Sequence, residues 1–599
     1  DWASDPRLLR AAGHLDMLGP MDTTDTVTPG GHSSPPDTPT RHPALDLGER
    51  RAPASGSLDA VVFGVTAVLS LAFIAWGLID TASLAGSSKA GLGWVVTNTG
   101  WFFALVATSF VVFVIWLAAG PFGSIPLGND GEAPEFRMAS WVAMMFSAGM
   151  GIGLMFYGAY EPLLHFVTPP PGARGGEAQA VETAMATTLF HWGLHPWAIY
   201  AVLGLAIAYS TFRRGRRLTV SAVLTPLLGR RQADGPVGKV VDILAIFATL
   251  FGSATSLGLG ALQIASGMTI VGWVGTTGNA LLVGIIVVLT IAFILSAVSG
   301  VAKGIQLLSN TNMVLALVLA LFVFVVGPTI FILNLLPTTL GAYAQDLFMM
   351  SGRTAVENKT TADWLAGWTI FYWAWWVSWT PFVGMFIARI SRGRTIREFV
   401  TGVLLVPTVV SLVWFAIFGG AGIKAQQNGA DLAGAASAEA SLFALLDTMP
   451  WATVTSILVM VLVAIFFVSG ADAASVVMGS LSQRGDIEPK RWVVVFWGAA
   501  TGAVAVIMLL VGGADALTGL QQITIVAALP FLVVMVALAV ALSKDLMTDP
   551  LVIRRRYGAD AVERAVVEGV SEHGDDFGLS VEKRDHADDA AAPGPGATV

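Results

Sequence analysis

A dense run of tryptophan lies between Trp364 and Pro381, where six of the eighteen residues are indoles. No charged residue occurs between Asp363 and Arg389. Residues three or four apart share one face of a helix. Along that face lie Trp368, Tyr372, Trp375, Trp376 and Trp379. Because aromatic faces attract cations, and a quaternary ammonium ion has no N–H to donate, the run predicts an aromatic cage for such an ion.

The alternative for these tryptophans is a belt at the lipid headgroups, where tryptophan is enriched in membrane proteins. A belt accounts for Trp364 and Trp368, which adjoin the polar segment 351–363. It accounts poorly for Trp375 and Trp379, which lie about two to four helical turns into an apolar segment. We therefore predict that the deeper indoles line a binding site.

The chain that must position these residues is strongly apolar. Of its 599 residues 55% are hydrophobic and 12% are charged, and its mean hydropathy is +0.70. Soluble domains carry roughly 25% charged residues, so we predict an all-α membrane protein with twelve transmembrane helices. The approximate cores of these spans are 59–80, 94–119, 138–166, 184–211, 238–267, 279–299, 306–336, 364–390, 398–423, 450–482, 491–513 and 519–543.

Polar segments flank this transmembrane domain of residues 58–543. Residues 1–57 predict a disordered cytoplasmic tail, and 544–599 form a second, C-terminal tail. No cleavable signal peptide is visible, and Met17 and Met21 are candidate starts of translation. Residues 337–362 predict an amphipathic helix on the outer surface. The chain has no cysteine, which excludes disulfides and thiolate metal sites.

Charge placement predicts the orientation of the spans. The loops that follow the even-numbered spans carry most of the cations: Arg213, Arg214, Arg216, Arg217, Arg230, Arg231, Lys303, Arg389, Arg392, Arg394, Arg397, Arg484, Lys490 and Arg491. The other side carries scattered cations: Lys89, Arg174, Arg353, Lys359 and Lys424. By the positive-inside rule, both termini are cytoplasmic.

Two spans contain residues that interrupt helices. The third span includes Gly149, Gly151 and Gly153, and the eighth includes the stretch Ser378–Pro381. These spans lie five apart, which matches an inverted five-plus-five repeat with a binding site at the midplane. The alternative for the glycines is close helix packing. If the third span is unwound there, its backbone N–H groups can bind an anionic group.

A second aromatic cluster lies in the fourth span, where FHWGLHPWAIY places Trp192, Trp197 and Tyr200. We predict that it faces the same cavity, the alternative being lipid. His191 and His195 are four apart, but no acid or cysteine adjoins them in the sequence, so we expect packing or hydrogen bonding rather than a metal. No dinucleotide or phosphate-binding glycine loop occurs, and no nucleophile has a partner, so we expect no enzyme activity.

Few acids lie within spans, which makes each conspicuous. Asp472 follows Ser469 in the tenth span, where hydroxyl and carbonyl oxygens offer the hard ligands that a small alkali cation needs. Thr249 and Ser253 share a face of the fifth span and offer a second set, although a lone hydroxyl often bonds its own helix. Glu161 and Asp242 lie near span ends, where interfacial positions account for them.

The predicted cavity lacks charge, which restricts the substrate. A fully cationic substrate usually meets a carboxylate. A zwitterion with a quaternary nitrogen needs only an aromatic box at one end and backbone N–H donors at the other, which Gly149–Gly153 can supply. We therefore favour a small zwitterionic quaternary-ammonium substrate.

Four stretches together resemble the betaine/choline/carnitine transporter family: GMGIGLMFYGAYEP, FHWGLHPWAIY, SLGLGALQI and FYWAWWVSWTPFVGMFIARISRGRTIREF. The resemblance covers residues 58–550. It implies a LeuT-like inverted repeat in spans three to twelve, two additional N-terminal helices and a homotrimer in the bacterial cell membrane. It also implies sodium as the coupling ion, with no other cofactor and no nucleic acid partner.

The resemblance also implies roles for individual residues. The cage would use Trp375, Trp376 and Trp379, with Trp192, Trp197 and Tyr200 as gate and pathway aromatics. One sodium site would use Ser147, Met150, Phe466, Ser469 and Gly470, and the other Thr249, Ser253 and Phe382. Glycine at position 153 is similar to the betaine-type branch, whereas the proton-coupled choline carriers have an aspartate there. The family's close members have Thr-Ser where this chain has Ser469-Gly470.

The resemblance implies a sodium-coupled symporter that imports glycine betaine, or a related compatible solute, for osmoprotection by alternating access. Ectoine, proline, carnitine or choline are alternative substrates, and a substrate-gated osmosensor is an alternative function. The C-terminal tail keeps Arg554–Arg556, and Asp560–Glu572 predict a short helix. Beyond Asp575 the tail is acidic, so anionic lipid would repel it.

Overall fold

The structure is a computed structural model. It describes residues 57–149, 151–173, 177–275, 277–299, 302–356, 358–434, 437–513 and 515–580. Within these ranges the chain is helical, without a β-strand. Apart from Ser57, the predicted tail of residues 1–57 lies outside the described residues, as does the end of the second tail.

Long helices, single or in pairs, cover every predicted span, and one further helix, α21, follows the last span. They are α1 (Ala60–Ile79), α2 (Thr81–Ala119), α3 (Met138–Gly149), α4 (Ile152–Val167), α5 (Glu177–Trp192), α6 (Leu194–Ala208), α10 (Pro236–Ile270), α11 (Asn279–Ser299), α12 (Ala302–Val326), α13 (Thr329–Ser351), α14 (Lys359–Gly367), α15 (Thr369–Ile390), α16 (Ile396–Gln427), α18 (Ala452–Ser482), α19 (Arg491–Gly512), α20 (Ala516–Met547) and α21 (Pro550–His573). Short helices connect them: a π-helical turn at Tyr209–Arg213, α7 (Val220–Val223), α8 (Thr225–Leu228), α9 (Arg230–Ala233) and α17 (Ser441–Asp447).

Nine helices of the described ranges are long and apolar enough to cross a membrane, and ten if α12 and α13 form one bent span. The protein is therefore a multi-span membrane protein, whereas the count of twelve stays a prediction. The predicted third span is divided into α3 and α4, which have 12 and 16 residues. Each is too short to cross a bilayer alone.

The predicted interruption of the third span is confirmed, because α3 ends at Gly149 and α4 begins at Ile152. The predicted interruption of the eighth span at Ser378–Pro381 is wrong. There α15 continues through Pro381, and the chain instead breaks at Trp368, between α14 and α15. A proline removes one helical hydrogen bond but is tolerated within membrane helices when neighbouring helices pack around it, and Pro381 is buried.

The amphipathic helix predicted for the outer surface at 337–362 stays a prediction, and the structure divides this segment between α13 and the start of α14. The helix α13 begins at Thr329, ends at Ser351 and turns by 108° from the preceding helix. One side buries Ile332, Leu335 and Tyr343, while Phe348 on the other side is 86% exposed. An amphipathic helix of this kind suits a membrane interface.

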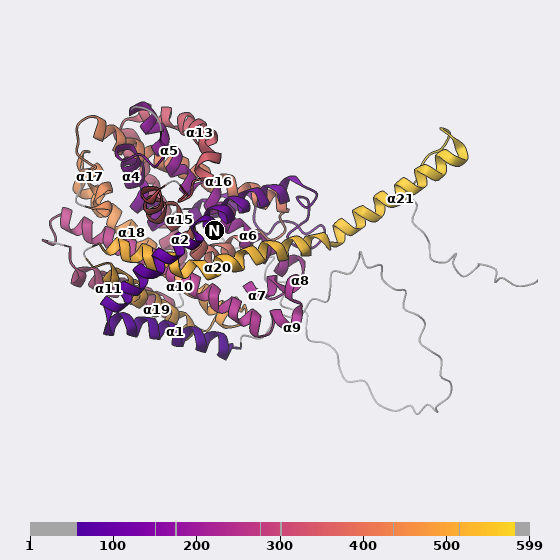
Figure 1. Cartoon of the computed structure of the whole chain (residues 1–599), viewed down its shortest axis with the longest axis horizontal. Coiled ribbons are helices and arrows are strands. Elements are labelled where there is room, and N and C mark those ends of the chain that lie inside the picture. The colour runs from indigo at the N-terminus through magenta and orange to yellow at the C-terminus, as the bar shows by residue number, and fades with distance from the viewer. Residues whose placement is uncertain are drawn as a thin grey trace, which may run out of the picture.

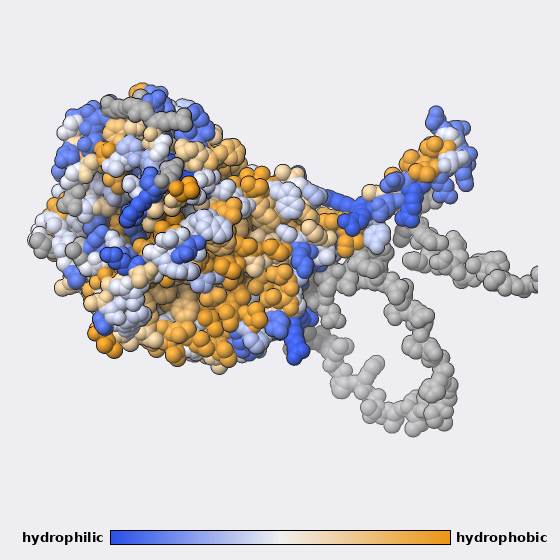
Figure 2. All heavy atoms as spheres, viewed as in Figure 1, coloured by the Kyte–Doolittle hydropathy of each residue, from blue (hydrophilic) through white to orange (hydrophobic). Residues whose placement is uncertain are grey.

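The helix α15 lies inside the bundle, packed against α6, α10 and α20, while α4 packs against α5 and α16 (Figure 1). Nearly all of α15 is buried, including Trp373 and Trp375. By contrast, α1, α2 and α11 expose large apolar side chains, as expected of helices that face lipid. A broad hydrophobic surface covers the middle of the body, and hydrophilic residues gather toward its ends (Figure 2).

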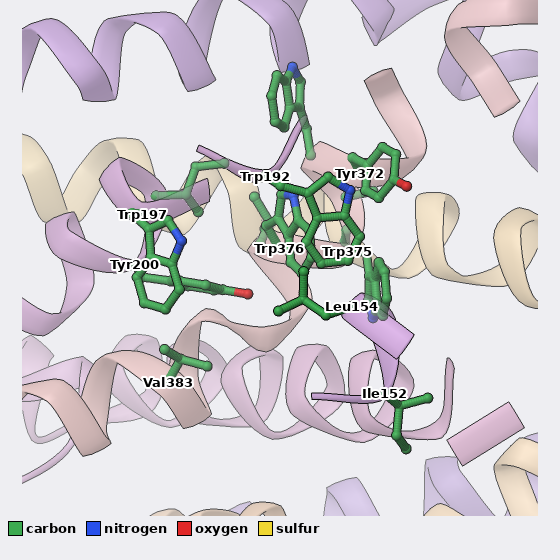
Figure 3. Close-up of a cluster of buried hydrophobic side chains, with 14 of the residues drawn as sticks. Ile152, Leu154, Trp192, Trp197, Tyr200, Tyr372, Trp375, Trp376 and Val383 are labelled. Atoms are coloured by element: carbon green, nitrogen blue, oxygen red, sulfur yellow. The ribbon is translucent and has the colours of Figure 1, made fainter. Parts of the chain in front are cut away.

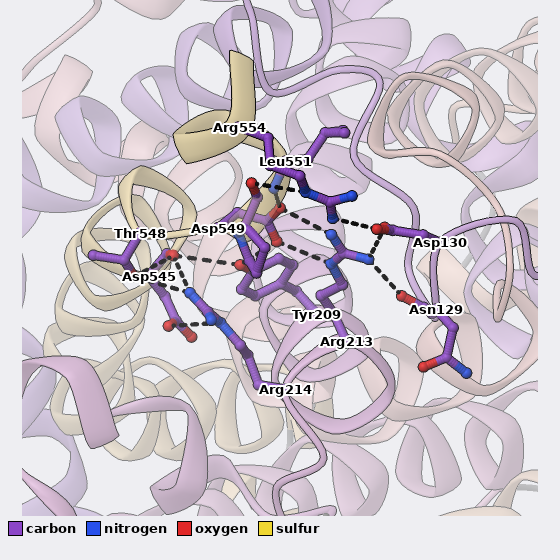
Figure 4. Close-up of polar contacts among 12 residues, drawn as sticks. Asn129, Asp130, Tyr209, Arg213, Arg214, Asp545, Thr548, Asp549, Leu551 and Arg554 are labelled. Carbon is purple, nitrogen blue, oxygen red and sulfur yellow. Dashed lines mark hydrogen bonds and ion pairs between the residues drawn. The ribbon is translucent and has the colours of Figure 1, made fainter. Parts of the chain in front are cut away.

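The helix α21 leaves the body as a projection (Figure 1) and is longer than the predicted helix at 560–572. Its base is held by a cluster that we call the ionic junction: Asp130, Arg213, Asp549 and Arg554 (Figure 4). The guanidinium of Arg213 donates to both carboxylate oxygens of Asp549, at 2.9 and 3.0 Å, and both side chains are fully buried. Asp130 accepts from Arg213 at 2.5 Å and also pairs with Arg554.

Candidate functional site

A cavity of about 250 Å³ lies between α4, α5, α6, α10, α12, α15, α16 and α18. All six aromatic residues predicted for the site line its wall: Trp192, Trp197, Tyr200, Trp375, Trp376 and Trp379. Gly151 and Gly153 lie on the same wall, while Gly149 is the last residue of α3 and its surroundings are outside the described side chains. The wall that the structure describes carries no charged side chain.

The aromatic rings pack closely around this cavity. The indoles of Trp375 and Trp376 are stacked, with ring centroids 4.8 Å apart and planes at 14°, and Trp192 meets Trp376 edge-on at 4.9 Å. Trp197 packs edge-on against Tyr200 at 5.3 Å. Figure 3 shows Trp192, Trp375 and Trp376 at the centre, with Trp197 and Tyr200 on one side and Tyr372 on the other. Residues from three helices thus form one aromatic cage, as the spacing predicts.

Hydrogen bonds to the indole N–H groups fix the orientation of the cage rings. Trp376 donates to the carbonyl of His191 at 3.0 Å, and Trp379 donates to the carbonyl of Gly252 at 2.8 Å. Trp375 donates to the hydroxyl of Ser256 at 3.3 Å. Because these polar edges already have partners, the π-faces are what the rings offer to a ligand.

Gly153 is required by the packing of the cage. A Cβ atom there would lie 2.7 Å from the ring of Trp375 and 2.8 Å from that of Trp192. Gly151, two residues earlier, precedes α4 in an extended conformation and offers no side-chain cap. The first N–H groups of a helix lack intrahelical partners, so the start of α4 presents donors beside the cage.

Five of the predicted sodium ligands lie on the cavity wall: Ser253, Phe382, Phe466, Ser469 and Gly470. Two of the hydroxyls are bonded to their own helices, since Ser469 donates to the carbonyl of Ile465 and Thr249 to that of Ala245, both at 2.9 Å. Thr249 is buried but is not on the wall. Met150 and the side chain of Ser147 lie outside the described residues.

Glu161 faces neither solvent nor lipid, whereas its depth in the membrane, and hence the interfacial position, stays a prediction. Its side chain is completely buried in α4 and accepts hydrogen bonds from Trp192 at 2.8 Å and Tyr372 at 2.5 Å. His191 lies 2.6 Å from its other oxygen. An acid therefore does accompany His191, contrary to the expectation from sequence, because α4 brings it from 30 residues away.

Glu161, His165 and His191 lie close enough together to suggest a metal site. However, Nδ1 of His191 and Oε1 of Glu161 are 2.6 Å apart, which is a hydrogen-bond distance. Two ligands of one zinc ion would each lie about 2.0–2.2 Å from the metal and hence about 3 Å or more from each other. The cluster is thus built as a hydrogen-bond network. His195 stands apart from it and stacks on Trp373.

The other two conspicuous acids are buried but are not among the residues that line the described wall. Asp242, near the start of α10, accepts from the backbone N–H of Ser221 at 2.9 Å and from its hydroxyl at 2.7 Å. These bonds hold the short helix α7 against α10. Asp472 is buried in α18 but is not part of the described wall.

Asn312 is a wall residue that the sequence did not indicate. It lies in α12, is 2% exposed, and neither amide atom has a hydrogen-bond partner among the described residues. Buried polar groups are nearly always hydrogen-bonded, so this amide is available to a ligand. A single asparagine in an apolar span carries no local pattern from which this role follows.

Comparison with known proteins gives a consistent result. The family described as BCCT, betaine/carnitine/choline family transporter, matches residues 61–551. The betaine/ectoine transporter LcoP of Corynebacterium glutamicum is 46% identical over 537 residues, which cover 89% of this chain and 85% of that protein. The glycine betaine transporter OpuD of Bacillus subtilis is 44% identical over 501 residues, 83% of this chain and 96% of its own length. Glycine betaine transporter 1 of Vibrio parahaemolyticus is 41% identical over 497 residues, which cover 82% of this chain and 94% of that protein.

Proposed function

The chain belongs to the betaine/carnitine/choline transporter family, and we propose that it is a sodium-coupled symporter that imports glycine betaine or a related compatible solute. Family membership makes it a membrane transporter rather than an enzyme. Three relatives that match this chain over most of their length are named as betaine transporters, which supports a quaternary-ammonium substrate.

The observation that carries the proposal is the aromatic cavity, whose described wall has no charged side chain. The indoles of Trp375, Trp376 and Trp379 have their N–H groups bonded to the protein, so they offer π-faces to a cation that cannot donate a hydrogen bond. The start of α4 offers N–H donors for the carboxylate of a zwitterion, and Asn312 offers an amide. A wall without charge favours a net-neutral substrate over a simple cation.

Sodium coupling is supported by oxygen atoms on the cavity wall. Ser253 and Phe382 both line it, as do Ser469, Gly470 and Phe466. Hydroxyl and backbone carbonyl oxygens are the ligands that a hard cation needs. One charge moving down a potential of 100 mV contributes about 2.3 kcal/mol, so a sodium ion is an effective driving ion.

Several further properties complete the proposal: a homotrimer in the bacterial cell membrane, alternating access through an inverted five-plus-five repeat, and cytoplasmic termini. The orientation is supported by cation placement. Arg213 and Arg554 meet at Asp130, and Arg392 pairs with Glu132 in the same loop, so the basic loops gather at one end with α21.

Ectoine is the second candidate substrate, because the relative at 46% identity is named a betaine/ectoine transporter. Ectoine presents a delocalised cation to the same aromatic box. The structure of the cavity is compatible with either, and competition by unlabelled ectoine against betaine separates them.

The test is uptake of radiolabelled glycine betaine into proteoliposomes, with sodium or potassium outside and at low or high osmolality. We expect accumulation that requires external sodium. Uptake that ignores sodium would contradict the coupling. Absence of betaine uptake together with sodium-dependent ectoine uptake would change the substrate but retain the mechanism. A rise with osmolality would show that the acidic tail does not prevent osmotic activation.

A further inference from the structure

Glu161 forms the most heavily bonded buried carboxylate beside the cavity. Oxygen Oε2 accepts from the indole N–H of Trp192 at 2.8 Å and from the hydroxyl of Tyr372 at 2.5 Å. Oxygen Oε1 lies 2.6 Å from Nδ1 of His191. The residue is completely buried, and it does not line the cavity itself. It therefore acts on a ligand only through its neighbours.

The hydrogen-bond pattern fits an ionised carboxylate. An indole N–H can only donate, so Oε2, with two donors, carries no proton. Nε2 of His191 lies 3.0 Å from the hydroxyl of Thr369. With its proton on Nδ1, a neutral His191 donates to Glu161 and accepts from Thr369, which satisfies all three groups. His165, whose Nε2 is 3.6 Å away, makes no hydrogen bond to the carboxylate. In this arrangement the cluster carries one net negative charge.

The two donors to Glu161 belong to the cage or to a ring stacked on it. Trp192 is on the wall and meets Trp376 edge-on. Tyr372 stacks on Trp376 with centroids 5.8 Å apart and planes at 19°, and on Trp375 at 6.3 Å and 28°. A ring that donates its N–H or O–H to a carboxylate gains electron density, and a more electron-rich face attracts a cation more strongly.

We propose that Glu161 is a positioning residue that gives the cage its preference for a positively charged headgroup. It holds Trp192 and Tyr372 in place and supplies negative charge from behind the rings, without touching the substrate. A carboxylate on the wall itself would repel the carboxylate of a zwitterion, whereas one behind the rings lies farther from it. This inference rests on the proposed function, because it requires a cationic headgroup.

The test compares two ligands of the same shape on the Glu161→Gln variant of the full chain in lipid nanodiscs. One ligand is radiolabelled glycine betaine, and the other is its carbon isostere 3,3-dimethylbutanoate, which has no positive charge and is measured by competition. We expect the affinity for betaine to fall about tenfold, in line with the strength of cation–π contacts, and the affinity for the isostere to change less than twofold. An equal fall for both ligands, or no fall, would overturn the proposal.

Two further variants guard against misfolding and non-specific effects. Tyr372→Phe removes one donor and keeps the carboxylate, so the betaine preference should fall by a smaller factor, about threefold; an unchanged preference would count against the proposal. Asp242→Asn removes another buried carboxylate, bonded only to the Ser221 region, and should leave the preference unchanged.

A wild-type chain that does not prefer betaine would contradict the cation cage of the proposed function. A wild-type preference that survives in Glu161→Gln would overturn only the role of Glu161.

Discussion

The cavity and the ionic junction are both buried and partly polar, but they differ in where charged side chains lie. At the junction, Arg213 and Asp549 are fully buried and pair directly. In the cavity, the described wall has no charge, and the carboxylate of Glu161 lies behind Trp192 and Tyr372. The junction binds one helix permanently to another, whereas the cavity must bind and release a ligand.

This difference has a physical basis. A buried ion pair that loses one partner leaves an uncompensated charge, which costs several kcal/mol. A site with such pairs would not empty easily. Aromatic faces lose much less when a cation leaves, because each cation–π contact contributes about 0.5–2 kcal/mol. The comparison predicts large stability effects at the junction and moderate, ligand-specific effects in the cage.

The largest effect is expected from Asp549→Ala. It leaves the guanidinium of Arg213 buried without its main partner and removes the acceptor at the start of α21. We expect a loss of about 3–5 kcal/mol of stability, seen as a lower midpoint of thermal unfolding, with the betaine Kd unchanged within twofold. Lys359→Ala breaks an exposed pair with Asp363 and should change the midpoint little. A strong effect of Asp549→Ala on Kd alone would contradict the separation of the two regions.

Trp376→Leu should have the largest effect in the cage. It removes the indole that stacks on Trp375 and Tyr372, and we expect betaine affinity to fall about 30-fold, the value of a desolvated cation–π contact of about 2 kcal/mol. Isothermal titration calorimetry measures the change. Trp101→Leu, at an exposed position on α2, is the matched control and should bind normally. If Trp376→Leu binds like the wild type, the cage assignment is wrong.

Gly153→Ala tests the packing of the same rings with one methyl group. The added Cβ would lie within 2.8 Å of Trp375 and Trp192, so the rings must move at a cost of about 1–3 kcal/mol. We expect betaine affinity to fall about tenfold. Gly284→Ala in α11, where a Cβ meets no atom within 4 Å, should not alter binding. Equal binding by both variants would show that the cage tolerates displacement.

The smallest effect concerns Asp130 at the exposed edge of the junction. Burial disfavours its charge, but hydrogen bonds from Arg554 and Arg213 outweigh this and lower the pKa of Asp130 below its ordinary value. A lowered pKa means that this carboxylate stabilises the junction above the unfolded pKa and that the contribution is lost only as pH falls through the lowered value. From pH 7 to pH 5 the attachment of α21 should therefore not weaken.

Spin labels can measure this attachment, because the chain has no cysteine of its own. Cysteines introduced at the exposed positions Val562 and Ile487 report the distance from α21 to the body. We expect the same distance distribution at pH 7 and pH 5, and a modest broadening in Asp130→Asn, since a half-exposed pair contributes about 1 kcal/mol or less. Broadening between pH 7 and pH 5 in the wild type would contradict the lowered pKa.

The sequence predicted those features that depend on local spacing. The helices cover all the predicted spans, and the indoles of α15 share a face because they are three or four residues apart. The third span is interrupted at its glycines because glycine lacks a Cβ and has a low helix propensity. Pro381 did not interrupt α15, because tertiary packing around a proline cannot be judged from its neighbours in the chain.

The missed features depend on residues that are distant in sequence. Glu161 meets His191 and Tyr372, which lie 30 and 211 residues away, so its position near a span end gave no indication of a network. Asn312 becomes significant only because α12 places it on the wall beside residues of other helices. An intramembrane acid within reach of aromatic N–H and O–H donors is the pattern that would have indicated Glu161.

The most direct measurement is a cryo-electron microscopy structure of the full chain in lipid nanodiscs with glycine betaine and sodium. The account predicts density for the trimethylammonium group within about 6 Å of the ring centroids of Trp375, Trp376 or Trp379, with no charged side chain in contact with it. Density for the ligand outside this cavity, or a carboxylate in direct contact with the ammonium group, would contradict the account.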